Sequence, residues 1–229
     1  MKTLRTTMHP GIMPPDVQIR ARYQRGPHLR SGDIDGSCGP LSLWSALIVL
    51  GIVTRPQVIC QKFMFSEDAF TETWLRSIDV WFAGATEEEH EVLLDTVSRY
   101  VRSSTCKGAM REQLEFTIDS LRRGDVVLLG MERPGARDGH WTLAVGLEEL
   151  ISKDSVEVIG ILCLDSSEPP PGLLRYNARL ELNVPQKRAT YVRFHGQSGD
   201  ARSMTIDRAI ALKRRPLPTR SPRRKEAGP

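Results

Sequence analysis

Cys38 is the residue best placed in this sequence for covalent chemistry. It lies in the run Asp-Gly-Ser-Cys-Gly-Pro at positions 35–40, between a polar loop and the expected start of an apolar helix. Unpaired backbone N–H groups and the helix dipole favour negative charge at such a place. A thiol there has a lowered pKa and reacts as the thiolate. A small cysteine at the start of a core helix would give the same pattern, so a partner histidine is needed before Cys38 counts as a nucleophile.

His140 is the candidate partner. It opens the apolar run Trp141–Gly146, which is typical of a strand, and a histidine at the mouth of a strand can face a cleft while the strand holds its backbone. A histidine in a surface turn is the alternative. Two other histidines need mention. His28 lies in the loop before Cys38 and is the fallback base, whereas His90 lies in an acidic helix, where we expect it to face solvent.

Asp165 could complete the set. It follows the apolar run Val158–Leu164, so it should lie at the end of a strand close to that of His140. A carboxylate there can accept the second imidazole N–H, fix the tautomer and stabilise the imidazolium. An aspartate that merely begins a turn is the alternative. The order Cys38, His140, Asp165 suits a nucleophile, its base and an orienting carboxylate, which together perform acyl transfer.

Two of these motifs resemble those of a known family. The run Cys38–Leu43 (Cys-Gly-Pro-Leu-Ser-Leu) resembles the C-G-P-x-S-L nucleophile motif of bacterial papain-like cysteine peptidases related to the bacteriocin double-glycine leader peptidases. Gly139–Gly146 looks like that family's glycine-histidine strand, and Asp165 followed by Pro169 is similar to its D-P ending with three residues inserted. The resemblance, which covers about residues 17–212 by order of elements, implies a cysteine peptidase with a protein or peptide substrate and no cofactor or metal.

The resemblance also implies an oxyanion-hole glutamine upstream of the nucleophile. Family members place it at the end of the first strand, and Gln24 follows the alternating run Val17–Tyr23, which predicts a strand. An amide N–H from Gln24, together with the backbone N–H of Cys38, would stabilise the developing oxyanion. A polar residue that simply ends a strand is the alternative.

The elements that must hold these residues fall into two parts. Helical spacing predicts helices over 41–48, about 70–82, after Thr86, and 110–122. After Gly124, apolar segments separated by turn residues predict strands over 125–131, 141–147, 156–164, 173–182, 190–194 and 204–212. Helices followed by strands indicate an α+β fold. With the resemblance, we expect a papain-like fold, with a helical N-terminal half packed on a mostly antiparallel sheet.

The composition of the chain predicts where the domain begins and ends. We expect one domain over residues 16–212, a flexible segment at 1–15, and a disordered, proline-rich basic tail at 213–229. The helices between Gly51 and Arg122 should shape one wall of the substrate cleft. Their large apolar side chains should lie in the core rather than against a ligand: Trp74, Trp81 and Phe82.

Composition indicates the cellular location and the kind of partner to expect. The chain is 40% hydrophobic and 26% charged, with no secretory signal at its N-terminus and no apolar run long enough to span a membrane. Four scattered cysteines without CxxC spacing argue against a disulfide framework. We therefore expect a cytoplasmic protein, or one secreted without a signal peptide. The net charge of +4 comes from Lys213–Lys225, which could contact an anionic partner but lacks the aromatic residues that stack on nucleic-acid bases.

Several functions stay open. Asp-Gly-Ser-Cys also resembles the opening of ovarian-tumour-type deubiquitinases, although the strands that follow His140 favour the first family. A Cys-His-Asp set can also support deamidation or transfer to an amine, as in transglutaminases. A catalytically inactive binding module is the alternative outside enzymes. Cleavage of a peptide or isopeptide bond is the function that the motifs favour.

Overall fold

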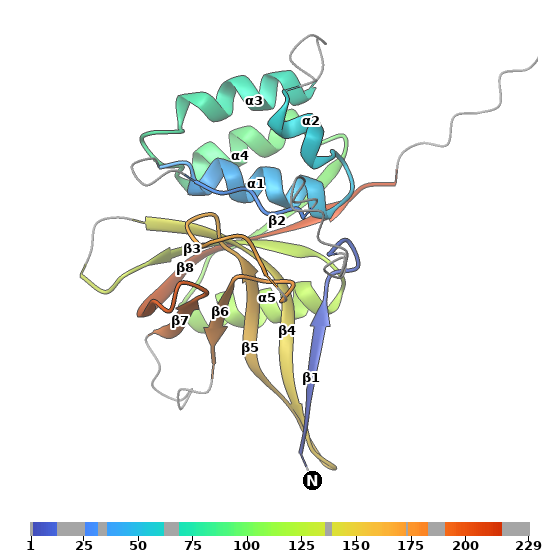
Figure 1. Ribbon diagram of the computed structural model, residues 1–229, viewed down its shortest axis with the longest axis vertical. Helices are drawn as coiled ribbons and strands as arrows, with labels where there is room; N and C mark the ends of the chain where they lie inside the picture. The colour runs from blue at the N-terminus through green and yellow to red at the C-terminus, as the bar shows by residue number, and fades with distance from the viewer. Residues whose placement is uncertain are drawn as a thin grey trace, which may run out of the picture.

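The computed structural model (Figure 1) describes residues 2–12, 26–31, 36–61, 69–135, 139–172, 174–182 and 191–216. Its helices are α1 (Cys38–Val49), α2 (Arg55–Ile59), α3 (Ala69–Asp79), α4 (Glu87–Thr96) and α5 (Met110–Arg122). Its strands are β1 (Thr3–Met8), β2 (Val101–Cys106), β3 (Val126–Glu132), β4 (Gly139–Ile151), β5 (Val156–Leu164), β6 (Ala178–Glu181), β7 (Val192–Gly196) and β8 (Ala201–Arg214).

Six strands close into an antiparallel barrel. Their order is β4-β3-β8-β7-β6-β5, and β5 pairs with β4 again to complete the circle. Strand β4 makes the closure possible because its first half pairs with β3 while residues 143–151 pair with β5. Shifts of register within the β4–β5 pairing, after Ala144 and after Glu148, let these strands bend. The remaining strands are additions at the outside, β1 on β4 and β2 on β8 (Figure 1).

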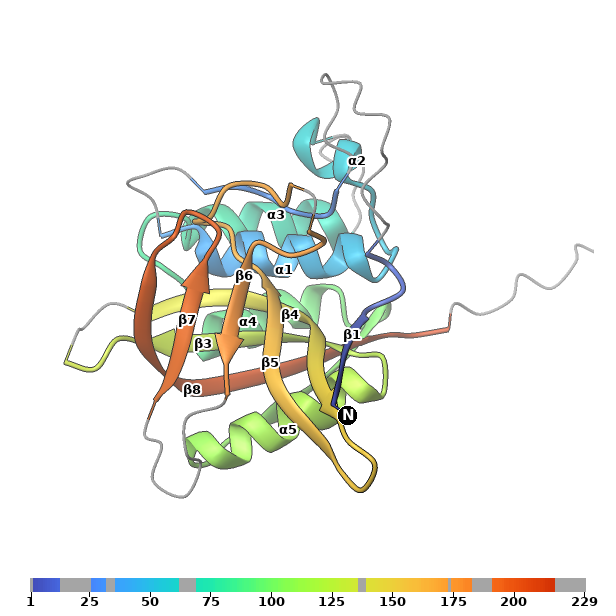
Figure 2. The same cartoon turned by 60° about the horizontal axis from the view of Figure 1, so that its bottom comes forward.

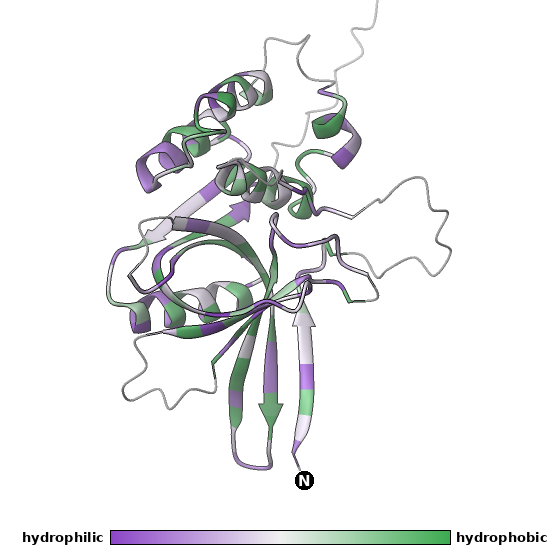
Figure 3. Ribbon diagram, turned by 60° about the vertical axis from the view of Figure 1, so that its left-hand side comes forward, coloured by the Kyte–Doolittle hydropathy of each residue, from purple (hydrophilic) through white to green (hydrophobic). Residues whose placement is uncertain are grey.

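The expected fold class is therefore wrong. We predicted a papain-like arrangement in which a helical half packs on an antiparallel sheet, but the described residues form mostly sheet, closed into a barrel, with few helices. The alternation of apolar residues marks which segments are strands, but it does not say which strand edges meet. Two strands also lie where none was expected. Strand β1 lies in the segment expected to be flexible, and its residues are mostly polar and exposed (Figure 3).

Several individual elements do match the expected ones. Helix α5 and strand β5 have the predicted bounds, and α1, α3 and α4 lie where helical spacing placed them. Helix α4 begins as its sequence suggests, because Thr86 and Glu89 form a reciprocal capping box at its start. Strand β8 continues to Arg214, two residues beyond the domain end drawn from composition.

Two hydrophobic cores lie on opposite faces of the central strands. On β3, Val126 and Leu128 belong to the core shared with α1, whereas Val127 and Leu129 belong to the core that α5 packs against. Alternate residues of a strand point to opposite faces, so both faces of β3 are apolar. Helix α1 packs across β3 and β4, which brings the start of α1 over the start of β4. Figures 1 and 2 show both beginning at the same side of the molecule.

Candidate active site

The pairing of β4 with β5 brings His140 to Asp165. These strands are antiparallel with Leu143 opposite Leu164, so β5 ends where β4 begins. The Nε2 atom of His140 lies 2.6 Å from Oδ2 of Asp165. The histidine side chain is 22% exposed and the aspartate is fully buried. The imidazole is therefore hydrogen-bonded to a carboxylate that is shielded from water.

Helix α1 places Cys38 on the other side of that imidazole. Cys38 is the first residue of α1, and His140 is close enough to its thiol to lower the pKa of that thiol. Because Nε2 of His140 faces Asp165, Nδ1 is the ring nitrogen left for the sulfur. The N–H of Trp141 also points at the Cys38 sulfur, with 3.5 Å between the two heavy atoms. A hydrogen bond from Ser42 Oγ to the Trp141 carbonyl, 3.3 Å long, joins α1 to β4.

Asp165 is held in place by further hydrogen bonds. Its Oδ1 accepts from the Ser167 N–H at 2.9 Å and from the Ser167 hydroxyl at 2.5 Å. Its backbone is fixed by Asn177, whose Oδ1 accepts from the Asp165 N–H and whose Nδ2 donates to the Asp165 carbonyl. Sequence reasoning missed Asn177, because an asparagine 12 residues downstream carries no signal of its own.

The charges of the three residues support one another. Burial raises the pKa of Asp165, but the charge and hydrogen bond of His140 and the bonds from Ser167 outweigh it and lower the pKa to about 2. Burial lowers the pKa of His140, but Asp165 and Cys38 raise it to about 10. Burial raises the pKa of the Cys38 thiol, yet His140 and the Trp141 N–H bring it below its ordinary value. The arrangement favours a thiolate beside an imidazolium at neutral pH.

Two further histidines, His28 and His90, lie outside the set of Cys38, His140 and Asp165. Nε2 of His28, the fallback base, lies 2.8 Å from the backbone carbonyl of Asp165 rather than on Cys38. The expectation that His90 faces solvent is wrong, because this residue is fully buried. Helix α4 turns His90 inward with Leu93 and Leu94, which lie one turn further along the same face.

Gln24 and the three other cysteines are the remaining residues to be compared with the sequence-based expectations. Gln24 and the strand expected before it lie outside the described residues. The other three cysteines are also free thiols: Cys60 is exposed, Cys106 is half-buried and Cys163 is buried. Burial raises the pKa of Cys106 and of Cys163, so neither shares the environment of Cys38.

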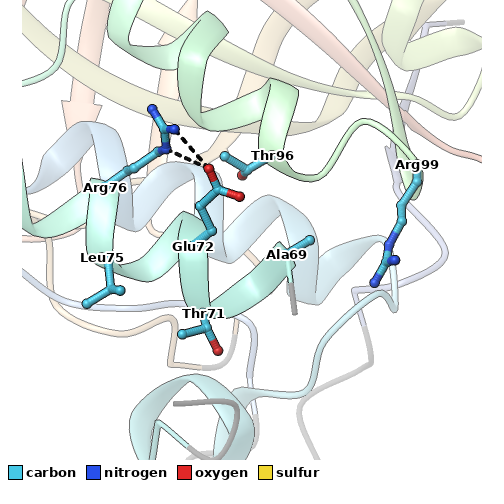
Figure 4. Close-up of a pocket in the computed structure, with 7 residues that line it drawn as sticks. All are labelled: Ala69, Thr71, Glu72, Leu75, Arg76, Thr96 and Arg99. Atoms are coloured by element: carbon cyan, nitrogen blue, oxygen red, sulfur yellow. Dashed lines mark hydrogen bonds and ion pairs between the residues drawn. The ribbon is translucent and has the colours of Figure 1, made fainter. Parts of the chain in front are cut away.

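An open pocket lies apart from these residues, at the start of α3 and the end of α4 (Figure 4). It contains the ion pair between Glu72 and Arg76, 2.9 Å long, and it has none of the three site residues in its lining. Within the described ranges, no cluster of three His, Cys, Asp or Glu side chains could hold a metal ion. No helix in the same ranges has the length and apolar character needed to cross a membrane.

No protein-family model matches this chain, and no curated protein matches it significantly.

Proposed function

We propose that this protein is a cysteine hydrolase that cleaves a peptide or isopeptide bond through Cys38, His140 and Asp165. The observation that carries the proposal is the position of the His140 ring. One of its edges meets a buried carboxylate at 2.6 Å, and the ring is close enough to the thiol at the start of α1 for each group to shift the pKa of the other. A nucleophile, a base and an orienting group in contact are the requirement for nucleophilic catalysis.

The reaction has two steps. The Cys38 thiolate attacks the carbonyl carbon, and the His140 imidazolium gives its proton to the leaving amine as the carbon–nitrogen bond breaks. This leaves a thioester on Cys38. A water molecule then loses a proton to His140 and attacks the thioester, which releases the acid and restores the thiolate. Asp165 keeps one ring edge occupied throughout, so the other edge stays directed at the reacting atoms.

Hydrogen-bond donors are needed to stabilise the negative charge on the oxygen of the tetrahedral intermediate. Cys38 begins a helix of 12 residues whose first turn contains no acidic residue. The backbone N–H of Cys38 and the positive end of the helix dipole are therefore suited to an oxyanion. Gln24 remains the proposed second donor.

Iodoacetamide labelling at near-neutral pH tests the proposal. We expect wild-type Cys38 to react much faster than Cys60, Cys106 or Cys163, as identified by mass spectrometry of the labelled peptides. The comparison with Cys60 is the most stringent one, because Cys60 is the exposed cysteine of the four and the reagent reaches it most easily. In His140→Ala the rate at Cys38 should fall, because the thiolate loses its partner cation.

His195→Ala is the matched control. His195 also pairs with an acidic residue, Glu181, at 2.9 Å, but on strands β7 and β6. This variant should label Cys38 at the wild-type rate. Slow labelling of Cys38 in the wild type, unchanged in His140→Ala, would refute an activated nucleophile. Fast labelling would justify a screen of peptide and isopeptide substrates with the same variants.

A further inference from the structure

The turn between α3 and α4, residues 80–86, closes against the chain on both sides of the nucleophile. A Cβ atom on Gly36, two residues before Cys38, would lie 2.4 Å from the Gly84 nitrogen and 3.0 Å from the Phe82 carbonyl oxygen. A Cβ atom on Gly39 would lie 2.7 Å from the Ala85 Cβ. Only glycine fits at both places, so this turn is a wall of the site and its position is tied to that of Cys38.

The same turn is tied to the strand that carries the base. The indole N–H of Trp141 donates to the Ala85 carbonyl at 2.6 Å, while its backbone N–H points at the Cys38 sulfur. The turn therefore has fixed contacts with α1 and with the start of β4. An acyl group on Cys38 would be attached between Gly36 and Gly39, the two residues that this turn contacts.

Phe82 projects from this wall into solvent. We expected it in the core, and that expectation is wrong, because it is 81% exposed. Its neighbours explain how this exposure is maintained. Val80 is buried in the first core and Trp81 packs against that core, so the backbone of the turn is held while Phe82 stays outside. Because its ring stays in water, an exposed phenylalanine does not gain the free energy that burial of apolar surface would provide.

We infer that Phe82 is a specificity-determining residue that packs against an apolar or aromatic side chain of the acyl group bound to Cys38. The inference rests on the proposed function. The chemistry of the turn supports an apolar ligand, since none of the residues from Val80 to Thr86 carries a charge. Aromatic rings pair favourably with other rings in addition to the area they bury. A substrate with an aromatic residue near the scissile bond would cover Phe82.

Two alkylating probes with the same reactive group test this inference. Iodoacetamide reports the reactivity of the thiol alone, whereas N-benzyl iodoacetamide adds one aromatic ring. We expect wild-type Cys38 to react faster with the benzyl probe than with iodoacetamide. Phe82→Ala should lower the benzyl rate by about two- to tenfold, the range of one aromatic pair, and leave the iodoacetamide rate unchanged. Phe82→Tyr should keep the preference.

Val156→Ala is the control for the loss of an exposed apolar side chain. Val156 is 51% exposed and begins β5, at the end away from Asp165, so its loss should affect neither rate. An unchanged benzyl preference in Phe82→Ala overturns the inference and leaves the proposed function standing. A fall in both rates overturns it too, because Phe82 would then support the site rather than contact the ligand. Slow reaction of wild-type Cys38 with both probes overturns the proposed function and this inference with it.

Discussion

Replacing Asp165 by asparagine is the most informative single change to this site. The substitution keeps the size of the side chain but removes its negative charge at a position that is fully buried. Asp165 is a leading cause of the raised pKa of His140, which burial alone would lower. We therefore expect the imidazole in Asp165→Asn to be neutral at neutral pH. Cys38 then loses its cationic partner and remains a thiol.

The size of the effect follows from the contact that is lost. The bond from His140 to Asp165 is 2.6 Å long and joins two charged groups. A hydrogen bond to a charged group contributes about 1.5–3 kcal/mol, and about 1.4 kcal/mol corresponds to a factor of ten, so alkylation of Cys38 should slow by about 10- to 150-fold. The Ser167 hydrogen bonds on the other carboxylate oxygen also weaken, which adds a cost in folding stability.

The assay is the rate of iodoacetamide labelling at Cys38 as a function of pH, together with urea unfolding to verify that the variant is folded. Asp125→Asn is the matched control, because Asp125 is also a buried carboxylate but pairs with Arg123. It should leave labelling of Cys38 unchanged. If folded Asp165→Asn labels at the wild-type rate with the same pH midpoint, then Asp165 does not set the state of His140 and our reasoning fails.

Four further predictions follow from the contacts of the site. Labelling of wild-type Cys38 should fall as pH falls through a midpoint below the usual thiol value of about 8.5, because its lowered pKa keeps the thiolate at lower pH. The turnover of a substrate should decline on the alkaline side only near pH 10, where the raised pKa of His140 removes the imidazolium; a stopped-flow pH profile with its alkaline limb near 6.5 would contradict this. Gly39→Ala should destabilise the fold by about 1–3 kcal/mol in urea titrations, because its Cβ would lie 2.7 Å from Ala85, whereas Gly26→Ala, with nothing within 4 Å, should not. Asn177→Ala should cost about 1–3 kcal/mol, because it removes the acceptor of the buried Asp165 N–H and one donor to the Asp165 carbonyl, and equal stability of the variant and the wild type would show that other groups take over.

Local patterns account for much of what could be predicted. The boundaries of α5 and β5 could be predicted because a helix repeats its apolar face every 3.6 residues and a strand every two, which are properties of the segment itself. The capping box at Thr86 is also local. The order of a cysteine before a helix, a histidine opening a strand and an aspartate ending the next one gave the three residues that the structure places in contact.

What the sequence left open depends on contacts between distant segments. Strand β1 is mostly polar, so only its pairing with β4 makes it a strand. Closure of the barrel depends on which edge of β5 meets β4, and alternation along a chain does not encode a choice of partner.

The same limit applies to single side chains. His90 and Phe82 lie only a few residues apart, and local sequence led us to expect the polar one in solvent and the apolar one in the core. Packing reverses both expectations, because α4 turns His90 inward while Val80 and Trp81 hold the turn that exposes Phe82. The sequence by itself determined which groups could react and in what order they occur. Only the tertiary structure decided which of them touch and what surrounds them, because burial and charge pairing act across space rather than along the chain.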